Sequence, residues 1–160
     1  MTSDLVVIGI GQTLRGDDGA GLAAVKTWQQ SYPDSARRSN LRVELAELPG
    51  IGLLSLLEGA QTAILVDAVR SGALPGTVHL LSEADLSNPL AGSATAHGWG
   101  VAETLALGWQ LTPRQMPGSI RLVGIEAGDL GMGEMLSPPV AAALNLAANQ
   151  IEQAICQVMA

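Results

Sequence analysis

Two apolar runs of strand length constrain the fold of this chain more than any other feature of the sequence. The first, residues 5–10, reads Leu-Val-Val-Ile-Gly-Ile, and the second, residues 62–67, reads Thr-Ala-Ile-Leu-Val-Asp. Neither run alternates between apolar and polar residues, which is typical of strands buried on both faces in a parallel sheet. The chain is therefore expected to bury a sheet between layers of helices.

Other segments complete an alternation of strands with helices. Further strands are expected at residues 41–45, 77–81 and 120–125, and helices at residues 18–30 and 52–57, from near His97 onward and from Pro138 onward. We predict an α/β fold with three layers, a twisted, mostly parallel sheet of about five strands with helices on both faces. With 160 residues and neither an internal repeat nor a linker, residues 1–160 are expected to form one domain.

Composition and charge exclude several classes of protein. A hydrophobic content of 48% rules out an intrinsically disordered chain, and a net charge of −7 disfavours a nucleic-acid-binding protein. The single cysteine, Cys156, cannot form an internal disulfide or a cysteine-based zinc site, and it is expected in the core. The chain opens without a signal-type apolar region and has no run of about 18 apolar residues. We expect a cytoplasmic monomer that contacts neither nucleic acid nor membrane.

Acidic side chains follow three of the predicted strands. Asp17 and Asp18 follow the first strand, Asp67 ends the second buried run, and Glu126 follows the last strand. Open parallel sheets bind ligands at the carboxyl ends of their strands, which lie at one edge. Burying a carboxylate there is costly unless it is paired, hydrogen-bonded or metal-bound. The pattern predicts an acidic site at this edge, although Asp67 can equally cap the turn after its strand.

The glycine-rich loop after the first strand has competing interpretations. A dinucleotide-binding fingerprint is disfavoured, because four residues separate Gly11 from Gly16 where the fingerprint has two, and because Asp17 and Asp18 would repel a pyrophosphate. One aspartate can cap the first helix. Two acids between glycines also suit a ligand site, since glycine lets a ligand or partner approach the backbone closely. The residue types alone leave capping and a ligand site equally open.

The chain has two histidines. His79 lies in a predicted strand and is expected to face solvent or to pack on the sheet surface. His97 lies in a glycine-flanked loop before a helix, and with Asp18 and Asp67 it would complete two oxygen ligands and one nitrogen ligand for zinc or nickel. Other chemistries are poorly supported, because the sequence has no Gly-x-Ser-x-Gly elbow and no Walker motif.

Four segments together resemble one protein family. They are Val-Ile-Gly-Ile-Gly-Gln-Thr-Leu-Arg-Gly-Asp-Asp-Gly-Ala-Gly at residues 7–21, Leu-Val-Asp-Ala at residues 65–68, the loop at His97, and Leu-Val-Gly-Ile-Glu at residues 122–126. In type, order and spacing they resemble the hydrogenase maturation endopeptidases, which process the large subunit of nickel–iron hydrogenases. The resemblance covers nearly the whole chain.

The resemblance implies a nickel-dependent peptide-bond hydrolase that removes a C-terminal extension from a hydrogenase large-subunit precursor after nickel insertion. It implies that Asp18, Asp67 and His97 are both the catalytic residues and the metal ligands. The precursor supplies the nickel, and another divalent ion can occupy the ligands in the isolated protein. The ion would polarise the scissile carbonyl or lower the pKa of a bound water. Whether an aspartate acts as general base stays open.

Two segments depart from the family pattern. Gln12 stands where the family has Asn, and residues 47–50 read Glu-Leu-Pro-Gly where many members have Asp-Gly-Gly. The second loop is expected to touch the substrate, so the identity of the cognate hydrogenase does not follow from the resemblance. Asp17 and Glu126 are expected to support the ligands or to contact substrate. Trp99 is expected to form an apolar wall for the partner or to anchor the core.

Two other functions stay open at this point. A non-catalytic metal-carrying or metal-sensing protein would dock on hydrogenase through the same three ligands without cutting it. A nucleotide-binding domain would need affinity for phosphate despite Asp17 and Asp18.

Overall fold

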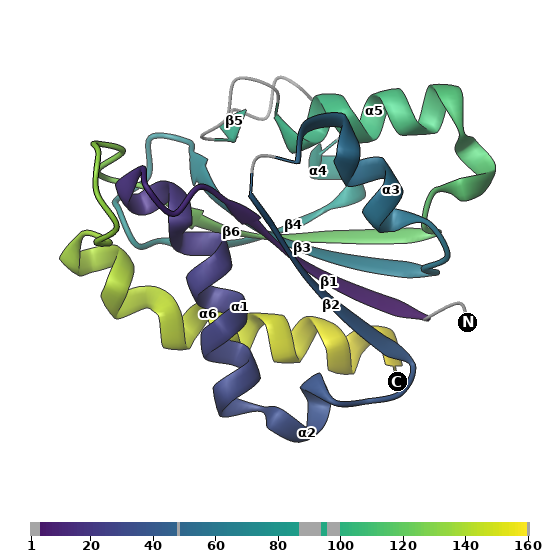
Figure 1. Ribbon diagram of the computed structural model, residues 1–160, viewed down its shortest axis with the longest axis horizontal. Coiled ribbons are helices and arrows are strands. Elements are labelled where there is room, and N and C mark those ends of the chain that lie inside the picture. Colours follow the sequence, from purple (N-terminus) through teal and green to yellow (C-terminus); the bar gives the residue numbers. More distant parts are fainter. Residues whose placement is uncertain (1–3, 48, 87–93, 96–99, 160) are drawn as a thin grey trace.

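The computed structural model describes residues 4–47, 49–86, 94–95 and 100–159, and an open sheet forms its centre (Figure 1). Its strands are β1 (Leu5–Gly11), β2 (Leu41–Glu47), β3 (Thr62–Arg70), β4 (Val78–Ser82), β5 (Ala94–Thr95) and β6 (Ser119–Glu126). The order is β2-β1-β3-β6-β4, and β5 pairs with β3 outside this path. The first four of these strands are parallel, whereas β4 and β5 are antiparallel to their partners. The predicted mostly parallel sheet is confirmed.

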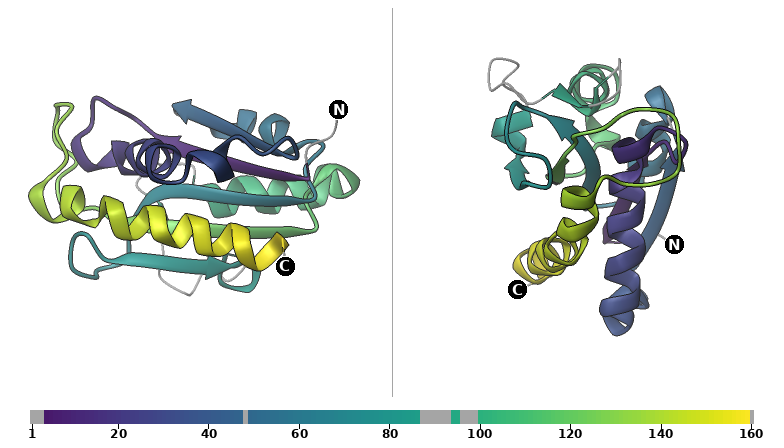
Figure 2. Two further views of the ribbon diagram at one scale, coloured as in Figure 1. Left: turned by 90° about the horizontal axis from the view of Figure 1, so that it is seen from below. Right: turned by 90° about the vertical axis from the view of Figure 1, so that its left-hand side faces the viewer.

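Helices cover both faces of the sheet, as predicted (Figures 1 and 2). α1 (Ala20–Ser31) and α6 (Pro138–Met159) pack on one face, and α3 (Leu53–Leu57) and α5 (Val101–Leu111) pack on the other. The other described elements are α2 (Pro33–Ala36), α4 (Glu83–Leu86) and the 3-10 turns η1 (Gly16–Gly19), η2 (Gly50–Gly52) and η4 (Pro113–Gln115). None of the described helices combines the length and apolar character needed to cross a membrane.

Alternate residues of the central strands contribute to two separate cores. In β3, Ile64 and Val66 pack with α1 and α6, whereas Ala63 and Leu65 pack with α3 and α5. A strand that is covered on both faces needs an apolar residue at nearly every position, which explains the unbroken runs in the sequence. The alternating segment at β2 is at the edge of the sheet and is partly exposed, as its pattern predicts.

Three expectations from the sequence are wrong. The second buried strand does not end at Asp67 but continues to Arg70, because its last residues gain β5 as an antiparallel partner. The first helix begins at Ala20 rather than at residue 18, because the preceding residues form the 3-10 turn η1. Cys156 is exposed, because α6 packs on the sheet through other positions of the same helix.

Candidate functional site

The acidic residues predicted to share an edge lie at the carboxyl ends of adjacent strands. β1, β3 and β6 are direct neighbours and run in the same direction. The turn after β1 carries Asp17 and Asp18, β3 carries Asp67, and β6 ends at Glu126. All four residues are at most 2% exposed. The sheet thus concentrates four carboxyl groups at one end, where burial is tolerated only with hydrogen bonds or cations.

Two glycines bring the turn with Asp18 directly onto the strand ends. A Cβ atom on Gly21 would lie 2.3 Å from the carbonyl oxygen of Val66 and 2.9 Å from the Cα atom of Asp67. A Cβ atom on Gly11 would lie 2.4 Å from the carbonyl oxygen of Asp18. Only glycine permits backbones to approach this closely. The glycines of residues 7–21 therefore seat η1 and the start of α1 against β3.

Asp67 interrupts an otherwise apolar strand face. It lies between Leu65 and Val69, which both pack in the core under α3 and α5, so its side chain is on that face of the sheet. Its Oδ1 atom accepts a hydrogen bond from Ala68 N at 2.8 Å. Because the strand continues beyond it, Asp67 does not cap a turn at a strand end, and that interpretation is wrong.

Asp17 binds the segment after β6 and does not cap a helix. Its Oδ2 atom accepts hydrogen bonds from Gly128 N (2.8 Å), Asp129 N (2.7 Å) and Ser137 Oγ (2.7 Å), and its Oδ1 atom accepts one from Ser137 N (2.7 Å). The N-cap of α1 is Gly19, so the interpretation of Asp17 as the cap of this helix is wrong. Burial raises the pKa of Asp17, but the four hydrogen bonds outweigh burial and hold the pKa below its ordinary value.

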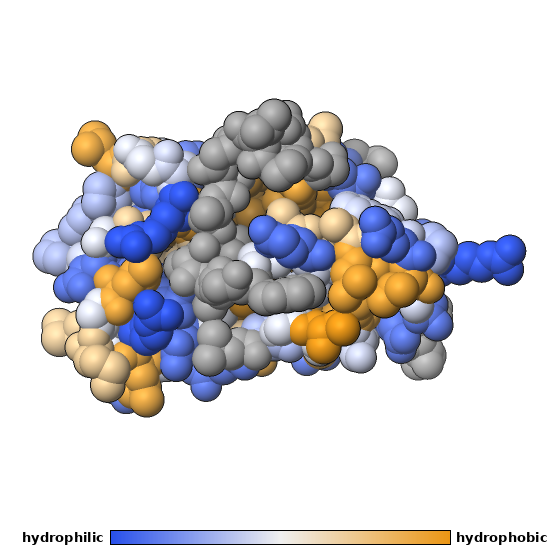
Figure 3. Space-filling model, turned by 90° about the horizontal axis from the view of Figure 1, so that it is seen from above, coloured by the Kyte–Doolittle hydropathy of each residue, from blue (hydrophilic) through white to orange (hydrophobic). Residues whose placement is uncertain are grey.

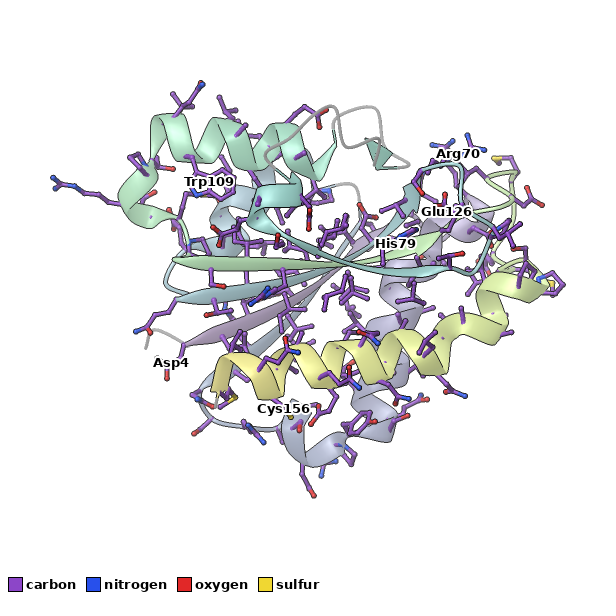
Figure 4. The ribbon with its side chains drawn as sticks, turned by 180° about the vertical axis from the view of Figure 1, so that it is seen from behind. Asp4, Arg70, His79, Trp109, Glu126 and Cys156 are labelled. Atoms are coloured by element: carbon purple, nitrogen blue, oxygen red, sulfur yellow. The ribbon has the colours of Figure 1, made fainter. Side chains whose placement is uncertain are left out.

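Glu126 joins β6 to the neighbouring strands at the same end of the sheet (Figure 4). It accepts hydrogen bonds from Ser71 N (2.8 Å) and the Ser71 hydroxyl, and its Oε1 atom lies 3.2 Å from His79 Nε2. The His79 side chain is 26% exposed. In the sheet, His79 on β4 and Asp67 on β3 are both paired with Gly124 on β6. Sequence patterns do not reveal this cluster, because it depends on the register of β4 against β6.

Glu47, at the end of β2, binds the turn after β1. Its carboxylate accepts hydrogen bonds from Thr13 N (3.0 Å) and from the Thr13 hydroxyl. These bonds, assisted by the charge of Lys26, hold the pKa of Glu47 below its ordinary value. The acid that departs from the family pattern thus ties the β2 end to the same turn that carries Asp18.

The predicted nitrogen ligand, His97, and the predicted apolar wall, Trp99, lie outside the described residues. The ligand set of Asp18, Asp67 and His97 therefore stays a prediction. Among the side chains that the structure describes, no group of three or more His, Cys, Asp or Glu is arranged to hold a metal ion. Asp18 and Asp67 lie on two elements that contact each other, η1 and β3.

Most of this chain is similar in sequence to known proteins. The family model "Hydrogenase maturation protease" matches residues 46–154. The hydrogenase expression/formation protein HupD of Bradyrhizobium diazoefficiens is 30% identical over 161 residues, which cover 98% of this chain and 78% of the relative. HupD of Thiocapsa roseopersicina is 30% identical over 139 residues, and the match covers 86% of this chain but 61% of that relative's length.

A solved structure extends the likeness to three dimensions. The NiFe hydrogenase maturation protease HybD from Thermococcus kodakarensis superposes with a TM-score of 0.73 at 25% sequence identity. The match covers 93% of this chain and 97% of that chain. The predicted α/β architecture is thus shared along nearly the whole of both chains.

Proposed function

Because the chain belongs to the hydrogenase maturation protease family, we propose that it removes a C-terminal extension from a hydrogenase large-subunit precursor once nickel has been inserted. In this proposal the nickel is part of the substrate. Asp18, Asp67 and His97 contact the ion when the precursor is bound, and the protein works in the cytoplasm.

The observation that carries the proposal is the pair of buried carboxylates at the strand ends. Asp18 and Asp67 come from different elements, and both are fully buried. Gly11 and Gly21 let the backbones of those elements approach so closely that a Cβ atom at either position would clash. Open parallel sheets bind ligands at the carboxyl ends of their strands, and Asp18 and Asp67 lie at two such neighbouring ends. Their placement supports a role in binding a cation.

The carboxylates would act on the metal and not directly on the peptide. Carboxylate and imidazole groups are both ligands of divalent transition metals. An ion held between the protein and its substrate polarises the scissile carbonyl or lowers the pKa of a bound water. An enzyme of this kind needs no nucleophile of its own, in keeping with a sequence that has no serine-nucleophile elbow.

Access to the carboxylates sets a condition on the mechanism. Neither Asp18 nor Asp67 has exposed surface in the free protein. The precursor must therefore displace neighbouring atoms when it docks, a change that is frequent in regulatory interactions. If the carboxylates contact the ion only after the precursor has docked, proteins that do not dock are not cleaved.

The test is to incubate the protein with nickel-loaded and with nickel-free large-subunit precursor and to weigh the large subunit by mass spectrometry. The proposal predicts loss of a C-terminal peptide only from the nickel-loaded precursor. Cleavage of both forms would overturn the role of nickel. Binding without cleavage of either form would overturn proteolysis and favour a metal-carrying or metal-sensing role.

A further inference from the structure

The segment between β6 and α6, residues 127–137 (the β6–α6 loop), is fastened to the turn after β1 by one buried carboxylate. Asp17 has no exposed surface and accepts four hydrogen bonds from this loop. Hydrogen bonds to an ionised acceptor are roughly twice as strong as neutral ones. Two donors come from the start of the loop, at Gly128 and Asp129, and two come from its end, at Ser137. A single side chain therefore fixes both ends of the loop.

Backbone hydrogen bonds attach the middle of the loop to the same turn. Gly133 N donates to Leu14 O (2.9 Å), and Gly16 N donates to Gly133 O (2.8 Å). Gly16 has a φ of 55°, and a Cβ atom there would lie 2.6 Å from Asp129 O, so only glycine fits this position. The turn after β1 and the β6–α6 loop therefore form one continuous surface.

This surface exposes large apolar side chains among acidic ones. Leu14 is 55% exposed, Met132 is 92% exposed and Met135 is 86% exposed. Figure 3 shows apolar patches between hydrophilic ones at the left-hand end of the molecule, where the loop lies. The loop carries Asp129 and Glu134 and contains no lysine or arginine, whereas the turn after β1 contributes one half-buried basic residue, Arg15, beside Gly133. Exposed methionines adapt to the shape of a partner, and the acidic charge complements a positive one.

We propose that Asp17 is a positioning residue and that the surface it holds, Leu14 with the β6–α6 loop, is where the precursor docks. The occupant is an apolar segment of the precursor that carries positive charge. The inference rests on the proposed function, since the precursor is the partner. Asp18 follows Asp17 directly in η1, so a segment bound to this surface leads toward the two buried carboxylates.

The proposal separates docking from catalysis. In Asp17→Asn the side-chain amide offers one acceptor oxygen, and its N–H groups would face donors of the loop. The position of Asp18 depends instead on backbone bonds, from Gln12 N to Asp18 O (3.2 Å) and from Asp18 N to Arg15 O (3.1 Å). Asp17→Asn should therefore raise KM for the precursor roughly tenfold and leave kcat within about threefold of wild type.

Three variants and a control test the proposal. Asp17→Asn weakens the side-chain attachment and leaves the backbone hydrogen bonds in place, Ser137→Ala removes the hydrogen bond from the Ser137 hydroxyl, and Met132→Gln changes the surface alone. Leu146→Gln, at a half-exposed site on α6, is the matched control. The measurements are hydrogen exchange of the loop amides in the isolated protein, the Kd for nickel-loaded precursor at two salt concentrations, and kcat and KM for cleavage.

We expect faster amide exchange in Asp17→Asn, less so in Ser137→Ala, and weaker precursor binding in both. Met132→Gln should weaken binding with exchange unchanged, Leu146→Gln should match wild type, and wild-type binding should weaken as salt rises. Unchanged Kd and KM in both Asp17→Asn and Met132→Gln would overturn the docking surface. Wild-type protein that binds precursor through this surface but never cuts it would overturn the proposed function and leave the docking surface supported.

Discussion

Gly21→Ala perturbs the contact that seats the turn with Asp18 on the strand ends. The added Cβ atom would lie 2.3 Å from Val66 O and 2.4 Å from Ile10 O. Restoring an ordinary contact requires the start of α1 to move by about 1 Å, because both oxygens belong to central strands that cannot move aside. Overpacking of this kind costs about 3 kcal/mol, the upper end of the usual range. A displacement of about 1 Å would also slow cleavage roughly 100-fold.

The assay is urea unfolding of Gly21→Ala beside Gly19→Ala. Gly19 lies two residues before Gly21, at the end of η1, and its φ of −82° suits any residue. A Cβ atom there would meet nothing closer than Thr13 Cα at 3.5 Å. The control should change the free energy of unfolding by less than about 1 kcal/mol. Equal free energies of unfolding for the two variants would refute the claim that α1 rests on the ends of β1 and β3.

Two further predictions concern the supports of the fold. Glu152 accepts hydrogen bonds from the indole N–H of the buried Trp28 (2.9 Å) and from Ser35 Oγ (2.6 Å). Glu152→Ala should lower the free energy of unfolding in urea by about 1–3 kcal/mol and Glu152→Gln by less, and equal losses would contradict this role. The pKa of Glu47 is lowered in the folded state, so its hydrogen bonds to Thr13 stabilise the fold at pH values above 4.5, the ordinary pKa. This stabilisation is lost as the pH falls through the folded-state pKa. Thr13→Val should raise the Glu47 pKa toward 4.5 in an NMR titration, and an unchanged pKa would contradict that cause.

The fold was predictable where local pattern and burial coincide. β1 and β3 are recognisable because both of their faces are covered, which makes nearly every residue apolar. The start of α6 at Pro138 is recognisable because proline suits the first turn of a helix. The strand order was not predictable, since it depends on which helices pack together far along the chain. The extension of β3 to Arg70 likewise depends on its pairing with β5.

The site was predictable only in part, for a related reason. Asp18 and Asp67 stand out as acids that follow or end apolar runs. The role of Asp17 is hidden, because its partners lie 111 to 120 residues away in a loop with no motif of its own. The pairing of His79 with Glu126 joins residues 47 apart and needs the register of an edge strand. Long-range contacts, and not residue types, decide which of the acids are structural.

The central claim is that Asp18 and Asp67 act on the nickel of the precursor. Its most direct test is the single-turnover rate of tail release from nickel-loaded precursor by Asp18→Asn, Asp67→Asn and Asp34→Asn, with the last an exposed acid on α2 as control. Thermal unfolding of each variant shows that it is folded at the assay temperature. The account predicts that the first two variants lose at least roughly 100-fold in rate while the control keeps the wild-type rate. Tail release within about threefold of wild type by folded Asp18→Asn and Asp67→Asn would contradict it.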